Sequence, residues 1–261
     1  MKLSISNIAW KADKDSILYE KMQQYGYSGL EIAPTRIFPD QPYNHLKEAA
    51  KWAEAIHKEY GYCISSMQSI WYGKQEKMFG SAEERQILLE YTKNAIDFAE
   101  AVGCGNLVFG CPRNRSIPVN GDEEIAVRFF RELGEYAVMH HTVIGMEANP
   151  TIYNTNYINE TPEALRLIRR VASAGFRLNL DVGTIIQNQE TVDMLGDYIE
   201  YINHVHISEP ELKPIQVREL HKELAKLLKG RYSGYVSIEM GTMDDLNQID
   251  QIMEYVKEIF G

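Results

Sequence analysis

The segment His-Val-His-Ile-Ser-Glu-Pro, residues 204–210, has the pattern of a β-strand that ends in a polar loop. It closes a short apolar run that begins at residue 201, and Pro210 cannot continue a strand. His206 is therefore predicted at the C-terminal end of a β-strand, with Glu209 in the loop beyond it. Because side chains alternate along a strand, His204 and His206 point to the same side, one layer apart.

Three other strand-like runs end in a carboxylate in the same way. Residues 143–146 precede Glu147, residues 177–180 precede Asp181, and residues 235–238 precede Glu239. A charged group at the end of an apolar strand is costly to desolvate unless it is paired or binds a cation. One such residue alone is often only a helix cap. Four in successive units predict one shared site, a metal site of Glu147, Asp181, His206 and Glu239.

Short apolar runs alternate with segments of helical periodicity along the whole chain. The predicted strands are residues 3–9, 29–33, 63–68, 106–110, 142–147, 177–181, 202–207 and 234–240. The predicted helices are residues 16–25, 46–60, 82–102, 123–140, 162–174, 192–198, 217–228 and 243–259. Strict alternation implies parallel strands with right-handed crossovers. Eight such units in about 250 residues predict an α/β fold, a single (β/α)8 TIM barrel over residues 1–261, with its active face at the strand C-terminal ends.

Composition narrows the class of protein. Hydrophobic residues make up 44% of the 261 residues, and no linker or low-complexity segment divides the chain. The net charge of -10 argues against a nucleic-acid surface, which needs a basic stripe. The cysteines (Cys63, Cys104 and Cys111) lack metal-ligand spacing and are expected to be reduced, as in a cytoplasmic protein. The N-terminal segment has neither a signal-peptide core nor a transmembrane length, so no membrane partner is expected.

The chemistry of the predicted site follows from its donor types. Three carboxylates and one imidazole are a hard, mostly oxygen-donor set, which favours one divalent ion, Mn²⁺ first and Mg²⁺ or Co²⁺ next. Zn²⁺ stays an alternative because its affinity for such ligands exceeds that of Mn²⁺ and Mg²⁺. Two glutamates flanking a metal-held hydroxyketone are suited to proton transfer, since one can remove a proton from carbon and the other can return it.

Four segments of the chain resemble a known family. They are Met-Glu-Ala-Asn (146–149), Leu-Asp-Val-Gly-Thr (180–184), His-Val-His-Ile-Ser-Glu (204–209) and Ser-Ile-Glu-Met (237–240). The chain resembles, over nearly its whole length, the xylose isomerase-like TIM barrel superfamily, in particular sugar or sugar phosphate isomerases and epimerases of the ketose 3-epimerase type. The resemblance implies the same four metal ligands, Glu147 and Glu239 as the catalytic pair acting through an enediolate, and a small sugar or sugar phosphate substrate. It also implies a homodimer or homotetramer.

Two positions depart from the family pattern. Many members have a substrate-contacting His three residues after the aspartate, where this chain has Thr184. Epimerases of free ketohexoses often have an Arg six residues after the ligand His, where this chain has Leu212, followed by Lys213. The resemblance therefore implies the chemistry more firmly than the identity of the sugar, its phosphorylation or the carbon that reacts.

Further residues at the predicted active face are candidate substrate contacts. They are Glu31, Gln68, Trp71, Arg113, Arg115, Asn149, Glu209 and Lys213. The basic residues are candidates for a phosphate or carboxylate, Trp71 for the apolar face of a sugar, and the others for hydroxyl groups. Each also has a structural alternative, such as a loop salt bridge or packing. His204 is interpreted as a buried, hydrogen-bonded core residue.

Other functions are consistent with the same barrel. A metal-dependent dehydratase of a keto-inositol or sugar acid would share the metal and the base but expel hydroxide. A non-catalytic sugar-binding relative would bind ligand without metal-dependent turnover, and Thr184 is its best support. An apurinic endonuclease would need additional histidines, yet the ends of the second and third predicted strands offer Glu31 and Gln68.

Overall fold

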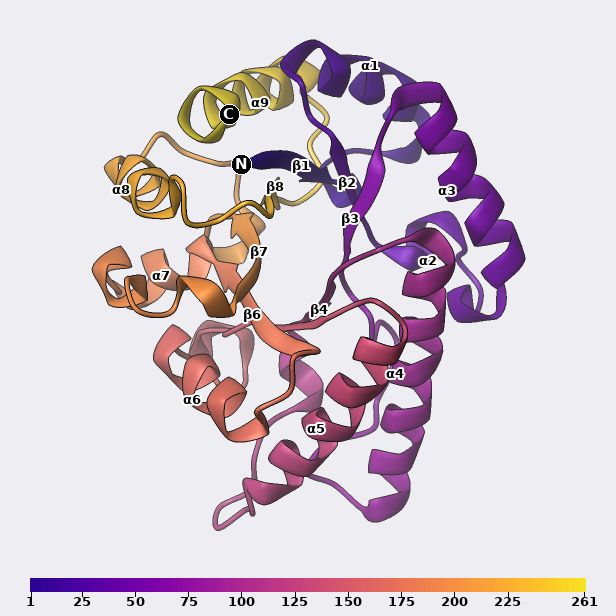
Figure 1. Cartoon of the computed structure of the whole chain (residues 1–261), viewed down its shortest axis with the longest axis vertical. Helices are drawn as coiled ribbons and strands as arrows, with labels where there is room; N and C mark the ends of the chain where they lie inside the picture. The colour runs from indigo at the N-terminus through magenta and orange to yellow at the C-terminus, as the bar shows by residue number, and fades with distance from the viewer.

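The computed structural model describes residues 1–261 as a closed barrel of eight parallel strands inside a ring of helices (Figure 1). The strands are β1 (Lys2–Ser6), β2 (Gly29–Ile32), β3 (Cys63–Met67), β4 (Leu107–Phe109), β5 (Ile144–Met146), β6 (Phe176–Asp181), β7 (Ile202–Ile207) and β8 (Tyr235–Ile238). Each strand pairs with the next, and β8 closes the barrel against β1. The predicted (β/α)8 barrel is confirmed.

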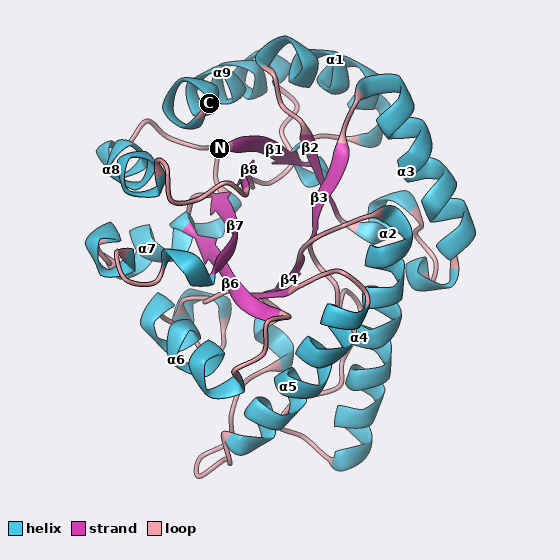
Figure 2. Cartoon of the chain, viewed as in Figure 1, coloured by secondary structure: helices cyan, strands magenta, loops and turns pink.

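The helices lie on the outside of the strands, as Figure 2 shows. They are α1 (Asp15–Tyr25), α2 (Pro34–Ile37), α3 (Leu46–Tyr60), α4 (Ala82–Val102), α5 (Glu124–Met139), α6 (Thr161–Val171), α7 (Val182–Asn188), α8 (Glu219–Leu228) and α9 (Leu246–Phe260). Glycines in the left-handed conformation end α1, α3 and α4. None of the helices combines the length and the apolar character that crossing a membrane requires.

Two predicted elements differ from the structure. The α-helix predicted at residues 192–198 is wrong, since Val192–Leu195 forms only a short 3-10 helix. The helix of this unit is instead α7, which begins directly after β6 because the Asp181 carboxylate accepts the backbone N–H of Thr184 at 2.6 Å. The first strand is also shorter than predicted, because Asn7–Ala9 leaves the sheet as a 3-10 helix.

The apolar core and the interior of the barrel are chemically different. A cluster of 69 buried residues forms the hydrophobic core, to which most helices contribute. Hydrogen bonds between strands that are not neighbours cross the barrel interior. His204 of β7 contacts Glu31 of β2 at 2.9 Å, and Asn106, beside β4, donates to Asn179 of β6 at 3.3 Å. The interior therefore holds a polar network, and the predicted site forms its upper layer.

Candidate functional site

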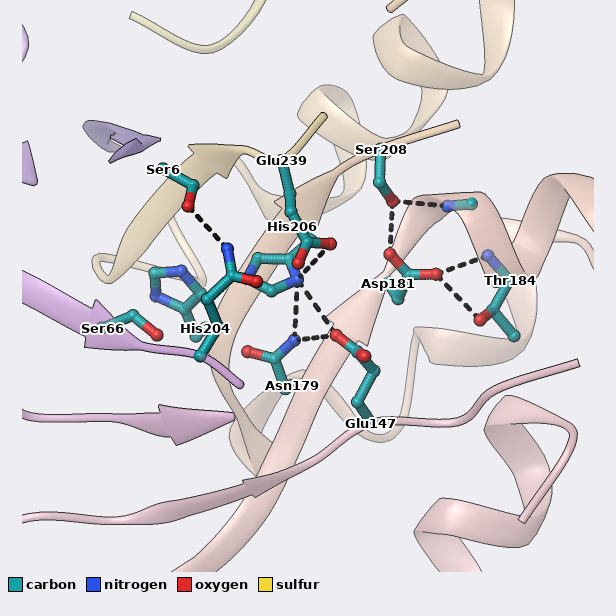
Figure 3. Close-up of polar contacts among 12 residues, drawn as sticks. Ser6, Ser66, Glu147, Asn179, Asp181, Thr184, His204, His206, Ser208 and Glu239 are labelled. Carbon is teal, nitrogen blue, oxygen red and sulfur yellow. Dashed lines mark hydrogen bonds and ion pairs between the residues drawn. The ribbon is translucent and has the colours of Figure 1, made fainter. Parts of the chain in front are cut away.

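The four predicted metal ligands meet at the C-terminal end of the barrel (Figure 3). Asp181 is the last residue of β6, and His206 pairs in register with it on β7. Glu147 and Glu239 follow β5 and β8 by one residue. One ligand atom from each side chain lies within 4.8 Å of those of the other three, and Glu147, His206 and Glu239 are buried.

The imidazole of His206 occupies the centre of the cluster. Its Nδ1 lies 3.0 Å from Glu147 Oε1 and 3.2 Å from Glu239 Oε2, whereas its Nε2 lies 2.9 Å from Glu31 Oε2. Burial lowers the pKa of His206, but the neighbouring carboxylates, with Glu239 foremost, raise it well above its usual value. When Nε2 donates to Glu31, Nδ1 remains as the donor atom for an ion. This donor set fits a hard divalent cation.

Glu31 supports the site from below and does not line its opening. Its side chain is fully buried and accepts from His204 Nε2 at 2.9 Å and from Gln68 Nε2 at 3.2 Å, besides the contact with His206. Burial alone would raise the pKa of Glu31, but the two histidines hold it well below its usual range. The structure thus argues against direct substrate contact by Glu31 and gives it a role in orienting His206. His204 is buried and hydrogen-bonded, as predicted.

The two glutamates have different surroundings. Glu147 Oε1 accepts from Asn179 Nδ2 at 2.8 Å, and its Oε2 accepts from Asn149 Nδ2 at 3.1 Å. The Glu239 carboxylate pairs only with His206. Burial raises the pKa of Glu239 to about 7, against the lowering effect of His206. Glu147 is therefore held by two amides, whereas Glu239 keeps an oxygen free of protein donors.

Asp181 is held by hydroxyl groups. It accepts a hydrogen bond from Ser208 Oγ, and its Oδ2 and the Ala148 carbonyl lie 2.8 and 2.7 Å from Thr184 Oγ1, whose single hydrogen can bond either of them. Burial, with the charge of Glu147, raises the pKa of Asp181 to about 6. Thr184 is 1% exposed, so this departure from the family pattern changes the support of Asp181 and presents no group to the opening.

Several predicted substrate contacts are engaged elsewhere. Glu209 is 3% exposed and forms a two-bond ion pair with Arg218, at 2.7 and 2.5 Å. Lys213 pairs with Glu211 at the surface, 2.6 Å apart. Trp71 is buried against Phe109, and its indole N–H donates to Thr92 at 2.8 Å. These contacts argue against direct roles for Glu209, Lys213 and Trp71 in binding substrate.

The other candidates are divided between the interior and the surface. Gln68 is buried and donates to Ser6 Oγ at 2.6 Å as well as to Glu31. Arg113 is exposed on the β4–α5 loop. Arg115 on the same loop is fully buried and donates to backbone carbonyls, so a phosphate at the opening cannot reach it. Asn149 remains the best-placed candidate, because its buried Oδ1 has no hydrogen-bond partner.

Sequence reasoning missed two residues that contact the candidate ligands. Asn179 precedes Asp181 by two residues on β6 and therefore points to the same side, a signal that strand alternation could have supplied. Ser208 lies two residues after His206, in the loop beyond β7, where no periodicity fixes its direction. The structure brings both to the rim of the cluster.

Comparison with known proteins gives the family. The sequence model of the xylose isomerase-like TIM barrel family matches residues 19–259. A search of curated protein sequences finds no match. Among solved structures, the chain is similar to a 3-keto-D-glucoside 4-epimerase from E. coli (19% identity, TM-score 0.77, 99% of each chain covered). It is also similar to a D-psicose 3-epimerase from Clostridium cellulolyticum (15% identity, TM-score 0.80, 100% of this chain and 99% of that chain covered).

A third similar structure is a sugar phosphate isomerase/epimerase from Parabacteroides distasonis, with 16% identity and a TM-score of 0.70 over 98% of this chain and 92% of that chain. At these identities the structural likeness shows the fold, which agrees with the family match over most of the sequence. The chain belongs to the xylose isomerase-like TIM barrel family.

Proposed function

We propose that the protein is a divalent-metal-dependent isomerase or epimerase of a small sugar. The observation that carries this proposal is the convergence of Glu147, Asp181, His206 and Glu239 within 4.8 Å, with the two glutamates contributed by different strands. The structurally similar epimerases of 3-keto-D-glucoside and D-psicose support the same class of substrate. The oxygen-rich donor set favours Mn²⁺ over softer metals.

The two glutamates would act on the carbon beside the substrate carbonyl. A bound divalent ion would hold substrate oxygens and stabilise the negative charge that develops on them in the enediolate. One glutamate accepts the proton from carbon, which leaves the electron pair in the enediolate, and the other returns a proton to restore the carbonyl. Glu239, with no protein donor except His206, is free to exchange a proton. Asn149 Oδ1 would accept a hydrogen bond from a substrate hydroxyl.

The test is deuterium uptake by NMR. The Mn²⁺-loaded protein is incubated in D₂O with a panel of ketoses and ketose phosphates. Exchange at a carbon beside the carbonyl is expected, together with its loss in Glu239→Gln. Glu209→Gln is the matched control, because Glu209 is also a buried glutamate but its carboxylate pairs with Arg218 and bonds none of the four candidate ligands.

Two results would oppose the proposal. Release of water from a substrate, without return of deuterium to the same carbon, would favour the dehydratase. Metal binding without exchange on any panel member would leave the family assignment intact but remove the epimerase proposal.

A further inference from the structure

Arg115 is a buried cation that no carboxylate neutralises. It is fully enclosed, and its hydrogen bonds go to backbone carbonyls and to the sulfur of Met146. Burying a charge without a partner costs several kcal/mol in general, and burial lowers the pKa of Arg115 to about 10, so it stays protonated near neutral pH. Because this cost is large, a role of the Arg115 guanidinium is to be sought in its hydrogen-bond partners.

The contacts of Arg115 converge on Glu147 by two routes. The direct route is the bond from Nη1 to the Glu147 carbonyl, at 2.8 Å. In the second route, Nη2 donates to the Ile158 carbonyl at 2.9 Å, and this carbonyl also accepts the backbone N–H of Asn149 at 3.0 Å. The Asn149 side chain in turn donates to Glu147 Oε2 at 3.1 Å. Arg115 thus fixes the backbone of Glu147 and the amide that orients its carboxylate.

The carbonyl at the far end of this clamp belongs to a strained residue. Ile158 has φ +58°, a left-handed conformation that a β-branched residue rarely adopts. Such backbone strain costs about 1–3 kcal/mol and persists only where surrounding contacts impose it. Here the contacts are those that bind the β5–α6 loop to the β4–α5 loop, since Asn156 also pairs with both backbone groups of Ile117, at 2.8 and 2.9 Å.

We propose that Arg115 is a positioning residue, which clamps the β5–α6 loop so that Glu147 and Asn149 face the ion and the substrate. The inference rests on the proposed function, because Glu147 is its candidate ligand and proton-transfer group. The guanidinium is suited to this role because it is planar and presents several donors in a fixed arrangement. Lysine can reach one carbonyl as a point charge, and methionine can donate to neither.

The test compares Arg115→Met and Arg115→Lys with a matched control, Arg131→Met. Arg131 also donates to two backbone carbonyls, those of Val171 at 3.1 Å and Arg170 at 2.9 Å, but it lies on the outer helices. Mn²⁺ affinity is measured by calorimetry on folded protein, and amide hydrogen exchange is measured over residues 147–158 without metal.

Arg115→Met is expected to bind Mn²⁺ about 10–100-fold more weakly, as for other groups that orient metal ligands, and to exchange the Asn149 amide faster. Arg115→Lys should lie between it and wild type, and Arg131→Met should match wild type in both measurements. A folded Arg115→Met with wild-type affinity and exchange would overturn the proposal. If Arg115→Met does not fold, the same two measurements on Arg115→Lys decide in the same way. If the wild type binds no metal, the proposed function fails. The hydrogen-exchange data then test by themselves whether Arg115 holds the β5–α6 loop in place.

Discussion

The substitution Glu31→Gln tests how the negative charge beneath the candidate metal centre affects metal binding. Glutamine has the shape of glutamate, and its carbonyl oxygen can keep both histidine bonds at the position of Oε2. The new side-chain nitrogen of residue 31 then occupies the position of Oε1 and needs an acceptor. A flipped Gln68 side chain supplies one, because its oxygen can accept from this nitrogen and from Ser6 Oγ. The substitution therefore removes a negative charge and leaves every hydrogen bond possible.

The magnitude follows from the His206 bond. Hydrogen bonds to charged groups contribute about 1.5–3 kcal/mol and neutral ones about 0.5–1.5 kcal/mol, so this bond weakens by roughly 1–1.5 kcal/mol. Loss of a partner that orients a histidine ligand typically lowers metal affinity about 10–100-fold, and because glutamine keeps the bond in weakened form we expect the lower end, about tenfold for Mn²⁺. The loss of a negative charge close to the ion acts in the same direction.

Calorimetric titration of Glu31→Gln with Mn²⁺ measures this loss. Glu209→Gln serves as the control, since Glu209 is also buried but bonds Arg218, and its Mn²⁺ affinity is expected to match wild type. A folded Glu31→Gln with unchanged Mn²⁺ affinity would refute the role given to this carboxylate.

Three further outcomes are expected. Without metal, the free energy of unfolding of the wild type, relative to that of Glu239→Gln, should decrease as pH rises from 4.5 to 7, because burial raises the pKa of Glu239 to about 7 and the folded wild type holds a proton there that the unfolded chain releases; urea denaturation showing a relative increase would contradict this. Thr184→Val should destabilise the protein by about 1–3 kcal/mol, since the one hydroxyl hydrogen shared between buried Asp181 and the Ala148 carbonyl is lost, and Thr184→Ser should restore most of that stability in the same assay. Ser81→Ala should cost about 1 kcal/mol by breaking the capping box with Glu84 at the start of α4, while calorimetry shows Mn²⁺ affinity unchanged.

The barrel and the four-residue cluster could be predicted because both follow from simple periodicities. Alternation of strands and helices implies parallel strands, and parallel strands in a barrel bring their C-terminal ends to one face. Residues such as Glu147 and Glu239, far apart in the sequence, were therefore expected in one place. The position on the strand alone determined which of the two histidines, His204 or His206, lies nearer the opening.

The remaining features depend on contacts that no local pattern encodes. Glu31 was placed at a strand end, but its histidine partners lie on β7, across the barrel. Arg115 lies in a loop without periodicity, so the sequence could not show whether its guanidinium faced the opening or the interior. Helix α7 has only seven residues, and although Asp181 was expected to be a metal ligand at a strand end, the helix that it caps was not predicted from the sequence. Short elements and loop side chains take their direction from tertiary contacts.

The closure of the barrel has a consequence for how the protein is made. Glu239 follows β8, and β8 pairs with β7 on one side and with β1 on the other, so that Lys2 lies opposite Tyr235. A nascent chain that has emerged from the ribosome only through β7 carries three of the four candidate ligands, and the edges of β1 and β7 are still unpaired. Strand pairing between segments far apart in the sequence, such as β1 and β8, forms slowly. We therefore expect high-affinity ion capture late in biogenesis, after the first and last strands have met.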